Sequence, residues 1–533
     1  MKRIAALVTT VALLAACGSS SEDTNLDQNR AGAMENYAVG TQFKATAPVT
    51  FTMLYSDHPN YPIKNDWLLW KEMAARTNVT ITPSVVPASD YNQKRNLVVS
   101  AGDAPFIIPK VYAGQETPFV ASGAVLPVSD YLDLMPHFKE KIEKWGMAPQ
   151  IDRLRQEDGK FYMLPGMHEK VWQDYTLAVR TDVMRELNLQ TPKTWDELHT
   201  VLKAMKARYP DSYPFSDRFS IPDPGGNLLN MISVAYGTTG GWGYDTTTWD
   251  AAQQKFVLTG AMPQYRDMLT YLHTLVAEGL LDPESFTQTD DQAKQKLGAG
   301  KTLVISSNAQ SLPTDYRPLL KDGAEMAKIP FLAGPAGEVT SYNRLESGIM
   351  ITAKARESEN FVALMQFIDW LFYSDAGQEF AKWGVEGVTY TRDAAGKRTL
   401  ADDVDFAGLN PDAPKHLQKD FGFQGGNFSY GGTTELLHSM FSAEEQAFQA
   451  AIAHKQPIPV PPPAPLSEEE REQVTLWETP LDDYVTQQTL RFILGQRDLA
   501  EWDAYVAELA AKNGTAYVDM MNEARTRYAD KNR

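Results

Sequence analysis

Two glycine-framed segments place aromatic side chains beside polar ones, outside any regular periodicity. Residues 238–245 read TTGGWGYD and carry Trp242 and Tyr244, whereas residues 425–432 read GGNFSYGG and carry Tyr430. Glycines on both sides leave Trp242 without a helix or strand to bury it, so its ring is either presented to a ligand or covers a hydrophobic edge. An exposed ring can stack on the C–H face of a sugar while polar neighbours bond to its hydroxyls. The chemistry indicated is carbohydrate binding.

Further candidates follow predicted strands or stand beside predicted turns. The candidate ligand-binding residues are Asp57, Trp172, Tyr175, Trp242, Tyr244, Asn308, Arg344, Glu346, Trp383 and Tyr430. Each has a structural alternative: Trp172 can be an inward-packed ring, and Trp383 is better explained by core burial on its position alone. Arg344 and Glu346 can form an ordinary surface ion pair, which contributes about 0–1 kcal/mol.

The amino terminus has the pattern of an export signal. Lys2 and Arg3 precede a short apolar run, 4–14, and small residues lead into Cys17. The run is too short to span a bilayer, so residues 1–16 are predicted to be a signal peptide. The cysteine at its end resembles the lipobox of bacterial lipoproteins, which implies that Cys17 is acylated and becomes the new amino terminus. Two or more acyl chains would give a stable anchor at the extracytoplasmic face of the cell membrane.

Composition limits the remaining classes of function. Residues 17–45 are polar and predict a flexible tether from the lipidated cysteine. Cys17 is the only cysteine, so the mature chain has no disulfide, thiolate metal cluster or cysteine nucleophile. The formal charge of −18 argues against nucleic acid as a partner, although a local basic pocket could still hold an anion. We expect a monomer that needs no cofactor.

Strand-like and helix-like segments alternate from residue 49 onward. Apolar β-rich runs near 49–55, 79–86 and 104–111 alternate with helical patterns, which favours an open α/β sheet with parallel strands. Ligands of such sheets bind beyond the carboxyl ends of the strands. Thr194, with Glu197 three residues later, is a good helix N-cap.

A set of ordered motifs resembles the family 1 extracellular solute-binding proteins of ABC importers. Residues 158–165 read DGKFYMLP, 176–182 read TLAVRTD, and 187–198 read LNLQTPKTWDEL. Shorter agreements are AGDAP at 101–105 and EGLLDP at 278–283, and KWGVEGVTY at 382–390 resembles the long subgroup that includes LplA-like and alginate-oligosaccharide-binding lipoproteins.

The resemblance implies two α/β lobes of the periplasmic-binding-protein type, joined by hinge crossings and followed by a helical C-terminal region. We expect an N-terminal lobe of 46–165 plus about 310–375, and a C-terminal lobe of 166–309 plus about 376–533. The implied function is capture of an oligosaccharide between the lobes by hinge closure and its delivery to ABC permease subunits.

One departure from that subgroup concerns calcium. Some of its members carry a calcium loop after the helix that begins near Thr194. The matching stretch here, 209–217, has two carboxylates and no glycine for the sharp turn that such loops need. We therefore predict no metal there, which weakens any transfer of alginate as the ligand.

Two other classes of function stay open at this point. A surface lyase or hydrolase acting on polysaccharides would need paired carboxylates, and 68 acidic residues make a search for such a pair uninformative. The sequence has no HExxH, GxSxG or P-loop motif. An adhesive lipoprotein without a small ligand is the third possibility.

Overall fold

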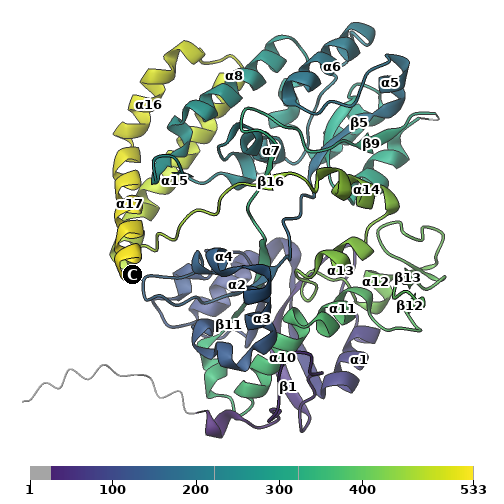
Figure 1. Ribbon diagram of the computed structural model, residues 1–533, viewed down its shortest axis with the longest axis vertical. Helices are drawn as coiled ribbons and strands as arrows, with labels where there is room; N and C mark the ends of the chain where they lie inside the picture. The colour runs from purple at the N-terminus through teal and green to yellow at the C-terminus, as the bar shows by residue number, and fades with distance from the viewer. Residues whose placement is uncertain (1–25, 221–222, 322, 532–533) are drawn as a thin grey trace, which may run out of the picture.

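The computed structural model describes residues 26–220, 223–321 and 323–531. The predicted signal peptide and Cys17 lie outside the described residues. Hydrophobic side chains gather into a first core of residues from 43–167 and 345–440, and into a second core, with a small satellite, of residues from 177–332 and 448–509. The chain therefore passes three times between two lobes, which Figure 1 shows one above the other.

The first lobe is built on a five-stranded sheet in the order β2-β1-β3-β11-β4. Strands β1 (Val49–Asp57), β2 (Val79–Pro87) and β3 (Ile107–Val111) are parallel, as the sequence predicts. Strands β11 (Leu345–Ile351) and β4 (Leu164–Met167) join antiparallel. Helices of this lobe include α1 (Leu68–Thr77), α2 (Tyr91–Ser100), α3 (Pro136–Trp145), α10 (Phe361–Tyr373) and α11 (Asp375–Trp383). Every residue of α10 is buried, because the helix is apolar on all sides.

The second lobe has a smaller antiparallel sheet in the order β8-β5-β9, formed by Val304–Ser307, Thr176–Arg180 and Met326–Lys328. Helices α6 (Trp195–Arg208), α7 (Gly226–Tyr236) and α8 (Pro263–Ala277) pack around it. The predicted N-cap of α6 is confirmed, since the Thr194 hydroxyl accepts the amide of Glu197 at 3.1 Å. The hairpin β6 (Thr247–Asp250) and β7 (Lys255–Leu258) lies beside the C-terminal helices.

The last part of the chain returns to the second lobe. Helix α14 (Ala443–Ile452) leads into the proline-rich stretch, whose first residues form β16 (Gln456–Pro457) against β10 (Val339–Thr340). Helices α15 (Glu468–Ile493), α16 (Trp502–Ala511) and α17 (Gly514–Lys531) then form the predicted helical region along the outer side (Figure 1). No helix in the described part of the chain is long and apolar enough to cross a membrane.

The hydrophobic cores divide the chain at other points than the predicted boundaries. Leu312 and Met326 pack with the second lobe, although the range 310–375 was expected in the first. Phe380 and Leu436 pack with the first lobe, although 376–533 was expected in the second. The third passage between lobes thus falls near residue 441, where no break in sequence pattern signals it.

Candidate functional site

Three aromatic rings of the second lobe form a cluster, and one of them is the partly exposed Trp242. Tyr175 lies edge-on to Phe219 and to Trp242, with ring centroids 5.6 and 5.4 Å apart, and Phe219 and Trp242 are 5.8 Å apart. Trp242 is 43% exposed, so it does not cover a hydrophobic edge completely. A Cβ at Gly226 would collide with the Trp242 indole, which explains why glycine begins helix α7 here. The cluster offers apolar ring surface that a sugar could stack on.

Polar groups border this cluster on both lobes. Burial raises the pKa of the Tyr175 phenol, while a hydrogen bond with Asn308 and the nearby Arg218 lower it. Tyr112, which follows β3 in the first lobe, is 59% exposed and close enough to add a small upward shift to the pKa of Tyr175. Tyr112 of the first lobe and Tyr175 of the second therefore lie near enough to interact electrostatically.

On the first lobe, the carboxyl ends of β1 and β3 come together with the glycine-framed loop 425–432. The side-chain amide of Asn427 donates to the Ser56 carbonyl at 2.9 Å and accepts the Ser56 amide at 3.0 Å. The loop is thereby held at the end of β1, where Asp57 and His58 follow. The His58 ring stacks on Tyr61 at 4.4 Å, and the Asp57 carboxylate accepts the amide of Ile63.

Four of the predicted site residues have their side chains engaged by the protein itself: Trp383 and Tyr430 are buried, and Arg344 and Tyr244 are half-buried. Trp383 is 1% exposed and donates from its indole to Ser439. Tyr430 is buried, and its hydroxyl accepts the backbone amide of Lys110 at 2.9 Å. The guanidinium of Arg344 donates to three backbone carbonyls rather than to Glu346.

Tyr244 packs toward Tyr265 in the second core, with ring centroids 6.3 Å apart, instead of joining the ring cluster. We assign these four residues a supporting position. Ligand contact stays a prediction for the other six, which are Asp57, Trp172, Tyr175, Trp242, Asn308 and Glu346.

Glu346 and Trp172 lie where the chain first passes between the lobes. The Glu346 carboxylate is bonded to His168 Nε2 at 2.7 Å and accepts the amide of Gly431. Burial raises the pKa of Glu346, but His168 and the nearby hydrogen bonds outweigh burial, so the pKa lies below its usual range. The Trp172 ring stacks on Phe441 at 6.0 Å and faces His168 at 5.6 Å. Trp172 Nε1 and His168 Nδ1 are buried without a partner in the described part of the chain, so both could bond to a ligand hydroxyl.

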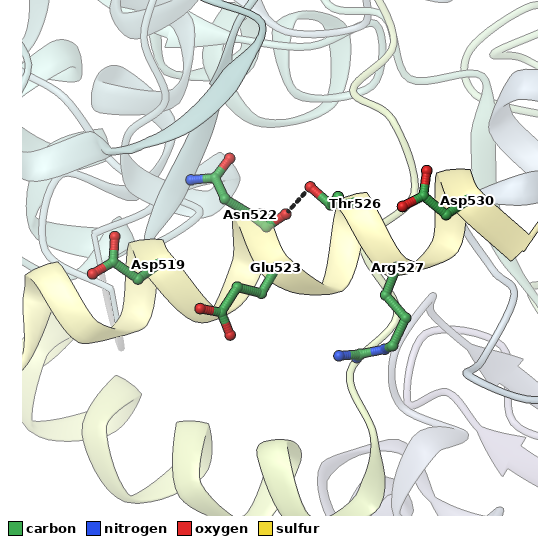
Figure 2. A pocket seen from close by; sticks show the side chains of 6 residues that line it. All are labelled: Asp519, Asn522, Glu523, Thr526, Arg527 and Asp530. Carbon is green, nitrogen blue, oxygen red and sulfur yellow. Dashed lines mark hydrogen bonds between the residues drawn. The ribbon is translucent and has the colours of Figure 1, made fainter.

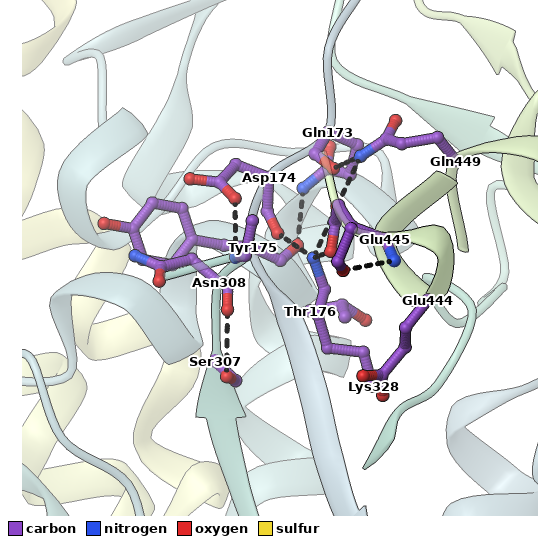
Figure 3. A network of polar contacts seen from close by, with 12 residues as sticks. Gln173, Asp174, Tyr175, Thr176, Ser307, Asn308, Lys328, Glu444, Glu445 and Gln449 are labelled. Atoms are coloured by element: carbon purple, nitrogen blue, oxygen red, sulfur yellow. Dashed lines mark hydrogen bonds and ion pairs between the residues drawn. The ribbon is translucent and has the colours of Figure 1, made fainter. Parts of the chain in front are cut away.

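A polar network joins the three passages between the lobes. Figure 3 shows the part of it around Gln173, Lys328 and Glu445. Gln173, on the first passage, accepts from Thr340 on the second at 3.1 Å, and its carbonyl accepts from Gln449 beyond the third at 2.9 Å. Below it, the ammonium of Lys328 binds both oxygens of Glu445 at 2.9 and 2.8 Å. These contacts fasten helix α14 and the passages to the second lobe.

A shallow hollow of about 560 Å³ lies elsewhere, along helix α17 (Figure 2). Its lining residues are Asp519, Asn522, Glu523, Thr526, Arg527 and Asp530. Arg527 is paired with Glu470, and Asn522 bonds to the backbone of Phe256. The hollow has no aromatic ring for a sugar, so we place the candidate site at the ring cluster instead.

The stretch in which calcium was not expected is held by a lysine. The ammonium of Lys206, on α6, donates to the carbonyl of Ser212 at 2.7 Å and lies 5.2 Å from the centre of the Tyr213 ring. Among the described residues, no group of three or more His, Cys, Asp or Glu side chains could hold a metal ion.

Sequence reasoning missed several residues of the site. Phe219 has a positive φ of 65° and follows no recognisable motif, and Arg218 next to it is bound by Asp290 and Asp315. Tyr112 was only part of a predicted strand end. Lys110 was not considered, because nothing in the sequence signals its backbone conformation, which has a φ of 56°.

The chain is similar to known solute-binding proteins along most of its length. Residues 69–408 match the family described as bacterial extracellular solute-binding protein. The fructooligosaccharide ABC transporter substrate-binding protein FusA of Streptococcus pneumoniae is 23% identical over 564 positions, covering 99% of this chain and 98% of FusA. The polygalacturonan/rhamnogalacturonan-binding protein YtcQ of Bacillus subtilis is 23% identical over 60% of this chain and 63% of YtcQ.

Solved structures agree on the fold. The alginate-binding protein AlgQ2 without calcium ion aligns with a TM-score of 0.67 at 21% identity, over 91% of this chain and 99% of AlgQ2. An extracellular solute-binding protein from Bifidobacterium longum subsp. infantis gives 0.68 at 17% identity, with the same coverage. The predicted two-lobe fold of the periplasmic-binding-protein type is confirmed, and the chain belongs to the bacterial extracellular solute-binding proteins.

Proposed function

We propose that this protein is the substrate-binding lipoprotein of an ABC importer and that it captures an oligosaccharide between its two lobes. The observation that carries the proposal is the ring cluster of Tyr175, Phe219 and Trp242, in which Trp242 is 43% exposed and Tyr175 lies near the exposed Tyr112 of the first lobe. The names of the relatives support a sugar chain as the ligand: FusA is a fructooligosaccharide-binding component, and YtcQ binds polygalacturonan and rhamnogalacturonan.

The ligand acts by favouring one arrangement of the lobes. A sugar stacked on Trp242 gains its contacts to Tyr112 and to the ends of β1 and β3 only when the lobes are close, so binding shifts the population toward the closed form. Permease subunits would recognise that form and receive the sugar. The protein leaves the glycosidic bonds intact.

The lipid anchor is a separate part of the proposal. Acylation of Cys17 after removal of residues 1–16 would hold the body at the extracytoplasmic face of the membrane. The predicted tether of 17–45 is too long, because Asn29 and Met34 bond to the first lobe and Phe43 is buried in its core. The name of a Bacillus subtilis relative, lipoprotein LipO, supports the lipid anchor. Cys17→Ser is expected to release the protein from the membrane fraction, and an unchanged distribution would contradict anchoring.

Titration calorimetry with a panel of oligosaccharides tests the capture proposal. The panel contains kestose, xylotriose, maltotriose, sialyllactose and trigalacturonate, and each mixture is then analysed for cleaved products. Micromolar or tighter binding of at least one sugar, recovered intact, supports capture. Cleaved sugar, or no binding to any member, overturns it.

Trp242→Ala locates the site. Loss of a stacked aromatic is expected to weaken binding about 10- to 100-fold, because such a ring contributes about 1–3 kcal/mol. Trp249→Ala is the matched control: Trp249 lies on the β6–β7 hairpin, packs against Phe256 at 5.2 Å, and is outside the ring cluster. Equal losses in the two variants would contradict the assignment.

A further inference from the structure

Lys110 is pushed out of the central sheet by a β-bulge. In the register of β11 with β3, Gly348 pairs with Val111 and Ile349 pairs with Pro109, so Lys110 between them has no partner. Its φ of 56° lies in the left-handed region, which glycine adopts far more readily than lysine. Bulges next to binding sites re-aim a side chain, and this one occurs at the carboxyl end of a parallel strand.

The Lys110 side chain lies within the candidate site. A Cβ added to Gly426 would come within 3.1 Å of its ammonium, so the chain passes over the glycine-framed loop. The ammonium is also near His58, whose pKa is lowered by burial and then by Lys110. Tyr112, two residues further on, is near enough to Tyr175 of the other lobe to raise its pKa slightly.

This ammonium has no anionic partner in the described part of the chain. No ion pair or side-chain hydrogen bond involves it there, and the nearby Asp57 carboxylate instead accepts the amide of Ile63. Partial burial lowers the pKa of Lys110, and no carboxylate counteracts that shift. A half-buried cation in a backbone conformation that disfavours its side chain is costly to keep, and such features concentrate at functional sites.

We propose that Lys110 binds a carboxylate of the ligand, so that the captured oligosaccharide contains an acidic sugar, a uronic or a sialic acid. The inference rests on the proposed function, because it places the charged group at the same site between the lobes. The net charge of the whole chain does not oppose it, since a single local cation in a partly buried position acts at short range.

Matched pairs of sugars test the charge directly. Trigalacturonate is compared with its fully methyl-esterified form, and sialyllactose with lactose, by titration calorimetry on the full mature protein. At least one acid is expected to bind about 10- to 100-fold more tightly than its neutral counterpart, the usual effect of a hydrogen bond to a charged group. That preference should weaken as salt is raised.

Variants assign the preference to the residue. Lys110→Met is expected to remove the preference for the acid while leaving binding of the neutral form within about threefold, and Lys110→Arg should keep most of it. Lys94→Met, an exposed lysine on α2 of the same lobe, is the control and should change nothing.

Neutral sugars bound as tightly as acidic ones, or a preference that survives in Lys110→Met, would overturn the inference while the proposed function stands. Failure of every sugar to bind would overturn both.

Discussion

Replacing Lys328 by methionine is predicted to destabilise the second lobe strongly, because it leaves a carboxylate buried without its counter-ion. The side chains of Lys328 and Glu445 are only 3% and 6% exposed. The three protons of the ammonium are directed to the two Glu445 oxygens and to the Asp174 carbonyl, and its charge lies 4.0 Å from the centre of the Phe448 ring.

The size of the effect depends on the buried Glu445 carboxylate that loses its counter-ion. Without Lys328, the Glu445 carboxylate keeps the amide of Gln449 at 2.9 Å as its side-chain partner, which does not neutralise it. Removing one partner of a buried ion pair costs about 3–5 kcal/mol of stability. For a lobe of this size, that corresponds to a fall in Tm of about 6–20 °C. The double variant Lys328→Met/Glu445→Leu should recover most of the loss, because two apolar side chains leave no buried charge.

Differential scanning calorimetry of wild type, both single variants and the double variant forms a thermodynamic cycle. Arg185→Met is the control, since its pair with Glu325 is 63% and 58% exposed and should contribute little to stability. The reasoning is refuted if each single variant loses less than about 3 °C and the losses add in the double variant.

Three further outcomes follow from buried polar contacts. Lys206→Met should lower stability by about 1.5–3 kcal/mol through loss of its bond to Ser212. Calcium or EDTA should leave the wild-type Tm unchanged, and a rise of several degrees with calcium would contradict the absence of a calcium site at this stretch. Burial raises the pKa of Glu116 to about 7, so the free energy of unfolding should fall by up to about 3 kcal/mol as pH rises from about 4.5 to about 7. Thermal melts across that range should show a smaller decline for Glu116→Gln than for the wild type. Asn427→Ala removes both bonds to Ser56 and should lower Tm and weaken sugar binding together; a variant of normal stability would count against the role of this loop.

The parts of the site that follow local sequence could be predicted. The ends of β1 and β3 meet because parallel strands end on one edge, and Trp242 is exposed because glycines surround it. Burial of Tyr430 could not be predicted, since its partner Lys110 is 320 residues away in sequence and its glycine-framed motif resembles a presented loop. Core burial of Trp383 is favoured by its position alone, but nothing local identifies its partner Ser439, which is 56 residues away.

Unusual backbone conformation is the second feature of the site that the sequence does not reveal. Lys110 and Phe219 are both in the left-handed region, where sequence patterns predict glycine or asparagine. The bulge at Lys110 depends on the pairing of β3 with β11, a strand more than 200 residues later in the chain. A register shift between strands so distant leaves no trace in either segment alone.

The contacts at the passages between the lobes also limit where the molecule can bend. On the second-lobe side, Gln173 holds Thr340 and Gln449, so three segments are fastened together there. On the first-lobe side, Arg344 bonds to the carbonyls of His168 and Trp145, which fastens two of them again.

The Glu169 carbonyl also accepts from Arg344, and the Tyr342 carbonyl accepts from Gln150 of the first lobe at 2.9 Å. Between the two sets of contacts the first passage therefore keeps only residues 170–172 and the second only residue 341. A rotation of one lobe against the other must be absorbed by these few residues, and Trp172 is among them. Its ring lies against Phe441 of the third passage, so closure that moves these segments would also move a ring whose indole N–H has no partner among the described residues. Sugar contact and lobe rotation would then be coupled at the Trp172 side chain. A ligand that makes different contacts in the open and closed forms of the protein favours the form in which its contacts are better.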